Sequence, residues 1–230
     1  WEVAKAVAER LASRSYVDIH LCRLPVTFAE GAVKLEECYQ ALPQAPVLVL
    51  ALGEGPCKVH LETMMYNMDH NPPGNRNAAD NAGVRFNRHT IIEGAPDKLG
   101  LRLDVKSLYC GLGDRERDFL KVSATPGNFV CNNNAFRFTL AHPEVPFSFA
   151  HVSSQSCRGE AKKRARSIDV ITQVVETQLK LVAGPATLDW PHPLNSVRLS
   201  TSKDEVRSQS PGASGCEAEF LKAWLKDIPN

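Results

Sequence analysis

The sequence lacks the features that mark several large classes of protein. It contains no internal repeat and no uninterrupted apolar run near the ~20 residues that a membrane-spanning helix needs. Its 27 basic and 26 acidic residues almost cancel, leaving a formal net charge of +1 at pH 7. No overall charge therefore favours nucleic acid or an anionic lipid surface. Apolar residues make up 43% of the chain and charged residues 23%, as in ordinary globular proteins.

Cysteine spacing of the kind that binds metal is also missing. The seven cysteines form no C-x-x-C pair and no paired Cys/His pattern, so we predict neither a zinc site nor any other metal site. An odd number of cysteines without a framework, in a chain this long, favours reduced thiols in a cytoplasmic protein. Most of them are expected to be small buried apolar groups. They lie at positions 22, 38, 57, 110, 131, 157 and 216.

One basic cluster interrupts the balanced charge. A group of this size is usually a solvated approach to a helix, and no aromatic side chains accompany it as a stacking platform for bases. We therefore expect no nucleic-acid partner, and steeply salt-dependent binding of RNA or DNA would overturn that expectation. The cluster consists of Arg158, Lys162, Lys163, Arg164 and Arg166.

Hydrophobic periodicity predicts alternating helices and strands. The run 46–53 is continuously apolar and closed by glycine, which is typical of a central parallel strand covered on both faces. The segment 98–117 is interpreted as a passage from strand to helix, and the Asn/Gly/Pro-rich stretch 67–83 as a loop. Helices are predicted at 1–13, 29–42, 131–141 and 167–183 (the last capped by Ser167), and strands at 16–24, 46–53, 119–123 and 147–152.

This alternation indicates a mostly parallel, twisted sheet with helices on both sides, in a three-layer α/β/α sandwich. We assign residues 1–184 to this domain. Residues 185–230, rich at first in Pro, Ser and Thr, are assigned to a C-terminal extension, partly irregular, with a short terminal helix over 217–227 that could dock on the body. Because chemistry in such sheets lies at the carboxyl ends of strands, we expect Gly53–Glu54, Thr125–Cys131 and His151–Ser154 to share one edge.

Cys131 is the candidate nucleophile. It lies where a strand and a turn, Ser123 to Val130, give way to a predicted helix. Free N–H groups and the positive end of the helix dipole favour the thiolate, which is the reactive form of cysteine. The alternative is an inert cysteine buried at the start of a helix.

His151 and Glu62 are weaker candidates when each is taken singly. His151 follows an apolar strand, where a histidine is often simply packed and hydrogen-bonded. Glu62 lies in a segment with apolar periodicity, so it could equally be an exposed carboxylate on a helix face.

Taken together, the three residues resemble the catalytic residues of the pyroglutamyl peptidase I family of cysteine peptidases. The order and approximate spacing of the matching motifs hold from about residue 1 to residue 183. The cysteine motif is quite specific, whereas the histidine and glutamate motifs are short and gain force from their order. The matching segments are Thr-x-Gly-x-Phe-Val-Cys-Asn at 125–132, Phe-Ala-His-Val at 149–152, Leu61-Glu62 with Asn67 and Asp80-Asn81, Leu-Pro-Val-Thr-Phe at 24–28, and the apolar strand 46–53.

The resemblance implies a peptidase that removes an N-terminal pyroglutamate from peptides, without metal or organic cofactor. Cys131 would attack the scissile carbonyl, His151 would act as base and acid, and Glu62 would orient the imidazole. Asp80 is the alternative orienting carboxylate. The backbone N–H of Cys131 would donate to the oxyanion. The partners implied are pyroglutamyl peptides, and homo-oligomer formation stays open.

The resemblance also implies a pocket for the uncharged lactam, built from apolar walls and backbone groups. Phe129 and Val130 would line this pocket, the backbone of Gly53 and Glu54 would bind the ring, and Arg76 would lie near the site. Core packing is the alternative for Phe129 and Val130, an ordinary loop for Gly53–Glu54, and an exposed loop cation for Arg76.

Some features depart from the family pattern. The chain opens at Trp1 with a helix-like segment, without the strand and Gly/Phe-rich loop that contribute aromatic residues to the family's pocket. We therefore expect that the natural beginning is missing. The second hypothesis is accordingly a catalytically weak relative that binds peptides without turning them over. The loop between Glu62 and Asp80 is longer than usual, and Pro126 and Asn128 stand where small or hydroxyl residues are expected.

Overall fold

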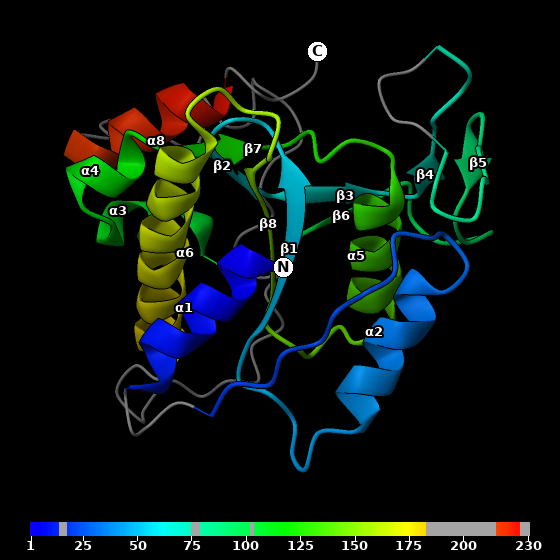
Figure 1. Cartoon of the computed structure of the whole chain (residues 1–230), viewed down its shortest axis with the longest axis horizontal. Helices are drawn as coiled ribbons and strands as arrows, with labels where there is room; N and C mark the ends of the chain where they lie inside the picture. The colour runs from blue at the N-terminus through cyan, green and yellow to red at the C-terminus, as the bar shows by residue number, and fades with distance from the viewer. Residues whose placement is uncertain (14–17, 75–78, 102–103, 183–214, 226–230) are drawn as a thin grey trace.

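The structure is a computed structural model that describes residues 1–13, 18–74, 79–101, 104–182 and 215–225 (Figure 1). Its centre is a four-stranded sheet in the order β1 (Val49–Gly55), β8 (Phe147–Ser153), β2 (Val59–Glu62) and β7 (Leu120–Ser123). The pairs β1–β8 and β2–β7 are parallel, whereas β2 and β8 are antiparallel. Two of the three pairings are thus parallel, which confirms the predicted α/β fold with a mostly parallel sheet.

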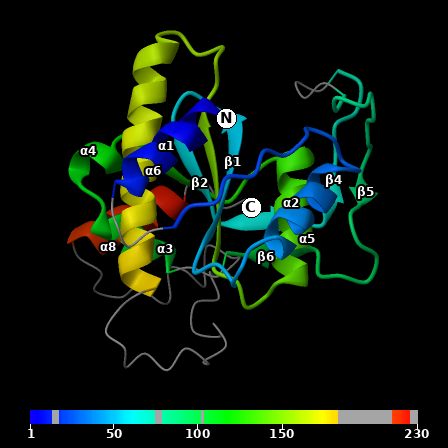
Figure 2. The ribbon, with the colours of Figure 1, turned by 60° about the horizontal axis from the view of Figure 1, so that its bottom comes forward.

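Helices cover both faces of this sheet (Figure 2). On one face lie α1 (Glu2–Ala12), α3 (Val105–Gly111) and the long α6 (Glu160–Val182). Their apolar stripes bury the side chains of the strands that point the same way. The core members on this face include Val3, Val7, Leu61, Ala150, Val170 and Ile171.

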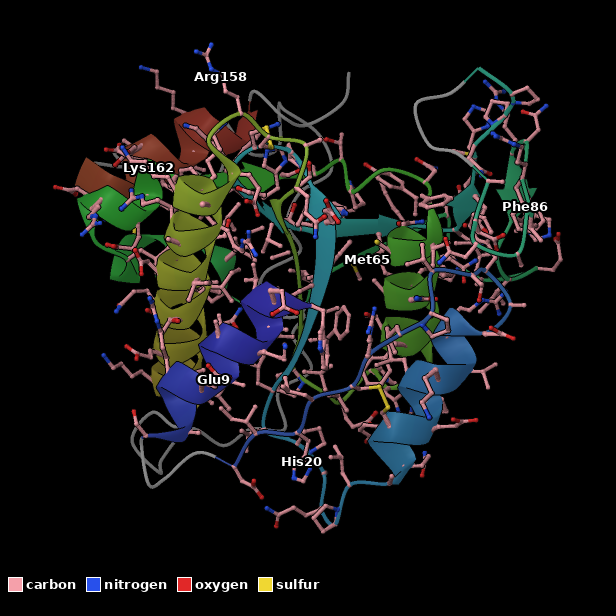
Figure 3. All side chains as sticks on the ribbon, in the orientation of Figure 1. Glu9, His20, Met65, Phe86, Arg158 and Lys162 are labelled. Carbon is pink, nitrogen blue, oxygen red and sulfur yellow. A yellow bond between two sulfur atoms is a disulfide. The ribbon has the colours of Figure 1, made fainter. Side chains whose placement is uncertain are left out.

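The opposite face carries α2 (Gly31–Gln40) and α5 (Val130–Ala141). Strand residues alternate between the two faces, so Phe147 and Phe149 of β8 point toward α5 whereas Ala150 and Val152 point toward α6. Met65, labelled in Figure 3, is fully buried in this second core. The candidate site forms where this second core reaches the end of the sheet.

Two small sheets extend the second face away from the centre. One pairs β3 (Met64–Tyr66) with β6 (Lys98–Gly100), and the other pairs β4 (Met68–Asp69) with β5 (His89–Thr90). Phe86, also labelled in Figure 3, lies beside the second of these small sheets, with its ring stacked on that of His89. Part of the predicted loop 67–83 thus contributes a strand. A short helix α4 (Asp114–Arg117) precedes β7.

Several predicted elements are confirmed with small shifts of their ends: the helices 1–13, 29–42 and 131–141, the strands 46–53, 119–123 and 147–152, and the strand-to-helix passage 98–117. The first apolar strand, however, is not central, because β1 lies at one end of the four-stranded order. Its apolar side chains are partly buried against the cores on both faces of the sheet, as an edge strand of a three-layer fold can be.

Two other predictions were wrong. The described part of the predicted strand 16–24, residues 18–24, has no ladder partner, and Cys22 instead ties this segment to α2 by a disulfide with Cys38. Helix α6 begins at Glu160 rather than at Ser167, so the basic residues from Lys162 to Arg166 lie within its first half. Ser167 is buried, accepts from the N–H of Ser153 and donates to its hydroxyl, and so does not cap the helix.

Disulfides overturn the expectation of reduced thiols. Cys22–Cys38, Cys57–Cys157 and Cys110–Cys216 are bonded, and Cys131 is the free cysteine. Sequence spacing could not reveal the last two pairs, whose partners are 100 and 106 residues apart. The Cys57–Cys157 bond joins the segments that follow β1 and β8.

The terminal helix of the assigned extension is observed as α8 (Gly215–Leu225). It is held to α3 by the Cys110–Cys216 disulfide, an ion pair between Lys106 and Glu217, and burial of Phe220 against Tyr109. The boundary predicted at residue 184 lies outside the described residues and stays a prediction. Among the described helices, none is long and apolar enough to cross a membrane.

Candidate active site

A glycine turn places Cys131 at the start of α5. Gly127 has a φ of 79°, a left-handed conformation that side chains rarely adopt. Phe129 is extended and α5 begins at Val130. Cys131 is therefore in the first helical turn, where backbone N–H groups have no acceptor within the helix and the helix dipole is positive. An anion at or beside this sulfur would be stabilised there.

Asn132, the next residue, fixes this turn to β3. Its Oδ1 accepts from the backbone N–H of Tyr66 at 2.8 Å, and its Nδ2 donates to the carbonyl oxygens of Tyr66 at 2.8 Å and of Met68 at 3.3 Å. The side chain is fully buried. A side-chain amide here pairs with the backbone as a neighbouring strand would, and so limits the movement of the residue before it.

His151 lies in β8 and points to the α5 face of the sheet. Its Nδ1 is 2.8 Å from Oε1 of Glu62, which is 1% exposed and extends from β2. The ring of Phe149, two residues earlier on the same face, lies 4.8 Å from the imidazole, centroid to centroid. The imidazole is therefore held by a carboxylate and an aromatic ring in a mostly dry environment.

The sulfur of Cys131 lies beside the side chain of His151 and interacts with it. Both groups gather over one backbone position, Gly53 of β1. A Cβ atom there would lie 3.0 Å from Sγ of Cys131 and 3.1 Å from Nε2 of His151. Since Nδ1 faces Glu62, the three side chains form a chain of contacts from sulfur to imidazole to carboxylate.

The environment changes the charge of His151. Burial by itself lowers its pKa, but hydrogen bonds with Cys131 and Glu62 and the negative charge of both partners outweigh burial and raise the pKa of His151 to about 9. The imidazole is thus protonated at neutral pH. An imidazolium beside a sulfur at a helix N-terminus is the arrangement that supports a thiolate nucleophile.

The other residues singled out in the sequence fall in different places. Val130 is 2% exposed and belongs to the interior, while Phe129 is partly buried with its ring edge-on to Phe28 at 5.4 Å. Glu54 is exposed and its Oε1 accepts from the backbone N–H of Gln155 at 2.8 Å. Arg76 lies outside the described residues.

Asp80 does not reach the histidine. Its carboxylate accepts from the backbone N–H groups of Phe28, Ala82 and Val84, and so organises a loop. Glu62 is the carboxylate that contacts His151.

Only two of the three segments expected at one edge of the sheet, those after β1 and β8, follow parallel strands. Gly53 and His151 are register partners on parallel strands, but β7 runs opposite to β8 through β2. The segment 124–130 therefore leaves the sheet at the other end and returns Cys131 through the turn at Gly127. Parallel topology was not the reason that these residues meet.

Sequence reasoning missed two features beside the site: Gly55, whose place next to His151 is seen only from strand register, and the Cys57–Cys157 disulfide. The Gly-x-Gly pattern at 53–55 directly after an apolar run was the available signal for the first. Among the described residues, no group of three or more His, Cys, Asp or Glu side chains could hold a metal ion.

Comparisons of the sequence find no matching family model and no matching curated protein. Comparison of the structure finds pyroglutamyl peptidases. The pyrrolidone carboxyl peptidase of Fervidobacterium islandicum aligns with a TM-score of 0.59 and 21% identity over 78% of this chain and 88% of that protein. Pyroglutamyl peptidase I of Bacillus amyloliquefaciens gives a TM-score of 0.61 with 19% identity over 76% and 86% of the two chains.

The pyrrolidone carboxyl peptidase of Thermococcus litoralis gives 0.58 with 20% identity over 77% and 87%. At these identities the alignments establish the architecture. The chain shares the α/β fold of the pyroglutamyl peptidases.

Proposed function

We propose that this protein is a cysteine exopeptidase that hydrolyses the bond after an N-terminal pyroglutamyl residue of peptides. The observation that carries the proposal is the contact series from Cys131 through His151 to Glu62, which brings the carboxylate of Glu62 to two residues far from it in the sequence. It lies on a fold shared with peptidases of this type.

The chemistry follows from the charges and positions of the three groups. The sulfur of Cys131 attacks the carbonyl carbon that joins pyroglutamate to the next residue, and the resulting oxyanion lies near the N–H groups of the first turn of α5. His151, protonated at neutral pH, gives its proton to the leaving amine. It then takes a proton from water, which attacks the thioester and releases pyroglutamate. Glu62 fixes the tautomer and stabilises the imidazolium.

Selection of the lactam rests on groups close to the sulfur. Phe129, which is partly buried, supplies apolar surface two residues before Cys131, Val130 stays a proposed lining residue from the family resemblance, and the backbone of Gly53 and Glu54 lies on the sheet side of the site. A pyroglutamyl ring carries no ammonium group, so no acidic side chain is needed to bind it. An apolar wall at this place fits such a ligand. Arg76 stays a proposed neighbour of the site from the family resemblance.

The disulfides bear on where the protein works. Three disulfides in one chain are typical of oxidising compartments and rare in cytosolic proteins. They favour an oxidising compartment over the cytoplasmic location that the cysteine spacing predicted. The free thiol of Cys131 is then the one cysteine among those described that remains available for catalysis.

Parallel assays with pyroglutamyl and alanyl fluorogenic amides test the proposal. We expect turnover of the pyroglutamyl amide alone, and loss of that turnover in Cys131→Ala with the fold retained by circular dichroism. Binding of a pyroglutamyl peptide without turnover would instead support the weak or inactive relative. Activity that survives in Cys131→Ala would contradict the nucleophile assignment.

A further inference from the structure

Two glycines of β1, Gly53 and Gly55, lie beside His151, at positions where a side chain would contact the imidazole. On the α5 face of the sheet, the residues of β1 are Val49, Ala51, Gly53 and Gly55 in order, so side-chain size falls toward the candidate site. The residues of β8 that pair with Ala51 and Gly53, Phe149 and His151, both carry rings on this face. The space given up by β1 is the space that the ring occupies.

The distances show that the imidazole of His151 fills the space left by the two glycines. A Cβ atom on Gly53 would lie 2.8 Å from Cδ2 of His151, and a Cβ atom on Gly55 would lie 2.7 Å from Cβ and 2.9 Å from Cγ of the same residue. Distances below 3.0 Å do not occur between such atoms without movement. The imidazole cannot move easily in response, because Glu62 holds Nδ1 and Phe149 lies against the ring.

We infer that Gly53 and Gly55 are positioning residues for His151: they form the wall that sets the ring between Cys131 and Glu62, and any side chain at either position would push the imidazole away from the sulfur. This inference rests on the proposed function for its effect on turnover, but not for its effect on geometry. For Gly53 it adds a role that differs from backbone binding of substrate. For Gly55 it assigns a role to a residue with no other part in the mechanism.

The chain offers two matched controls. Gly100→Ala introduces a Cβ whose nearest neighbour, Sδ of Met64, is 3.8 Å away, so no clash arises. Gly111→Ala introduces a clash of the same size, 2.7 Å from Cγ2 of Thr177, but on the other face of the sheet between α3 and α6. The first control measures the effect of an added methyl group, and the second the effect of a clash remote from the site.

The test compares Gly53→Ala and Gly55→Ala with these controls by three measurements: the thermal midpoint, the rate of Cys131 alkylation by iodoacetamide against pH, and kcat and KM on a pyroglutamyl amide. We expect both site variants to lower kcat about a hundredfold with little change in KM, as misplacement of a catalytic group does. We also expect the pH dependence of alkylation to shift. Gly111→Ala should lower the thermal midpoint without moving that pH dependence, and Gly100→Ala should change neither.

A double-mutant cycle keeps the inference testable even if a site variant is unstable. Most of the midpoint loss of Gly53→Ala should disappear in a His151→Ala background, because the clashing ring is then absent. The inference is overturned if the loss persists there, or if both site variants alkylate with the wild-type pH dependence. If the wild type fails to hydrolyse pyroglutamyl amides, the proposed function falls, whereas the cycle and the alkylation still decide the role of the glycines.

Discussion

Glu62 stands opposite Phe149 rather than opposite His151 in the β2–β8 ladder, and its carboxylate reaches along the strand to Nδ1 of the histidine. This diagonal contact leaves the other ring nitrogen for Cys131. The residue directly opposite His151 is His60. The register of β2 against β8 thus places a carboxylate on one side of the ring while the sulfur lies on the other.

The first prediction concerns the pH dependence of activity. Because the pKa of His151 is raised to about 9, kcat/KM should fall as pH rises through about 9, where the proton for the leaving amine is lost. Glu62→Gln removes one of the interactions that raise this pKa, so this descending limb should move to lower pH. The same change should lower kcat by roughly 10²–10⁴-fold, less than His151→Ala. A limb that stays in place in Glu62→Gln would show that another group orients the imidazole.

The same shift predicts a stability effect with a definite sign. The pKa of His151 in the folded protein lies above the ordinary value of 6.5, so its stabilisation is complete below pH 6.5 and is lost as pH rises through about 9. Chemical denaturation from pH 6 to 10 should show this decline in the wild type. His151→Gln should show a flatter profile over the same range, and an equally steep profile would contradict the assignment.

The second prediction concerns the number of reactive thiols. Iodoacetamide should add once to the native chain, at Cys131, and seven times after reduction and unfolding, because six cysteines are bonded in pairs. Intact mass spectrometry measures both numbers. Cys131→Ser should give no adduct in the native state. More than one rapid adduct on the native wild type would show that a disulfide is open.

Features of the site that depend on neighbouring residues could be predicted from the sequence, whereas features that depend on contacts between distant segments could not. Cys131, His151 and Glu62 could be predicted because each belongs to a short local pattern, and the order of the patterns supported their meeting. The Gly127 turn and the start of α5 depend on neighbouring residues only, so both were accessible. The strand register that places Gly53 beside His151 and Glu62 diagonally from it depends on pairing between distant strands.

The errors have the same origin. Cys57 and Cys157 are brought to a Cα–Cα distance of 5.6 Å only because β1 and β8 are neighbours, which no spacing rule contains. The odd number of cysteines was taken to favour reduced thiols, whereas it reflects three disulfides and one free thiol. Asp18–Leu24 alternates like a strand, yet no described strand pairs with it, since alternation alone cannot supply a partner.

The third prediction separates two disulfides by loop length. Cys57–Cys157 closes a loop of 100 residues and Cys22–Cys38 one of 16. By chain entropy such bonds contribute about 4.7 kcal/mol for a loop near 100 residues and about 3 kcal/mol for one near 15. The double variant Cys57→Ser/Cys157→Ser should therefore lose more stability to denaturant than Cys22→Ser/Cys38→Ser.

It should also lose more activity, because the longer-range bond joins segments that leave the sheet beside His151. Assays at a temperature where both variants are folded provide the comparison. Equal kcat in the two double variants would mean that the loops after β1 and β8 keep their positions without the bond.

The fourth prediction concerns a carboxylate outside the site. Asp69 is fully buried in β4; burial raises its pKa from 3.8 to about 6, against the opposing effects of a hydrogen bond from Asn133 and the charges of His89 and Arg137. A raised acid pKa means that the charged form is disfavoured in the fold, so stability should fall as pH rises from about 4 through 6. Asp69→Asn keeps the acceptor for Asn133 and removes the charge.

We therefore expect Asp69→Asn to unfold at higher denaturant concentration than the wild type at pH 8, and to lose most of this advantage at pH 4. Asp97→Asn, which changes an exposed carboxylate of the same type, is the control and should leave the profile as it is. If Asp69→Asn is instead less stable at pH 8, the attraction of His89 and Arg137 for the carboxylate exceeds the cost of burying it.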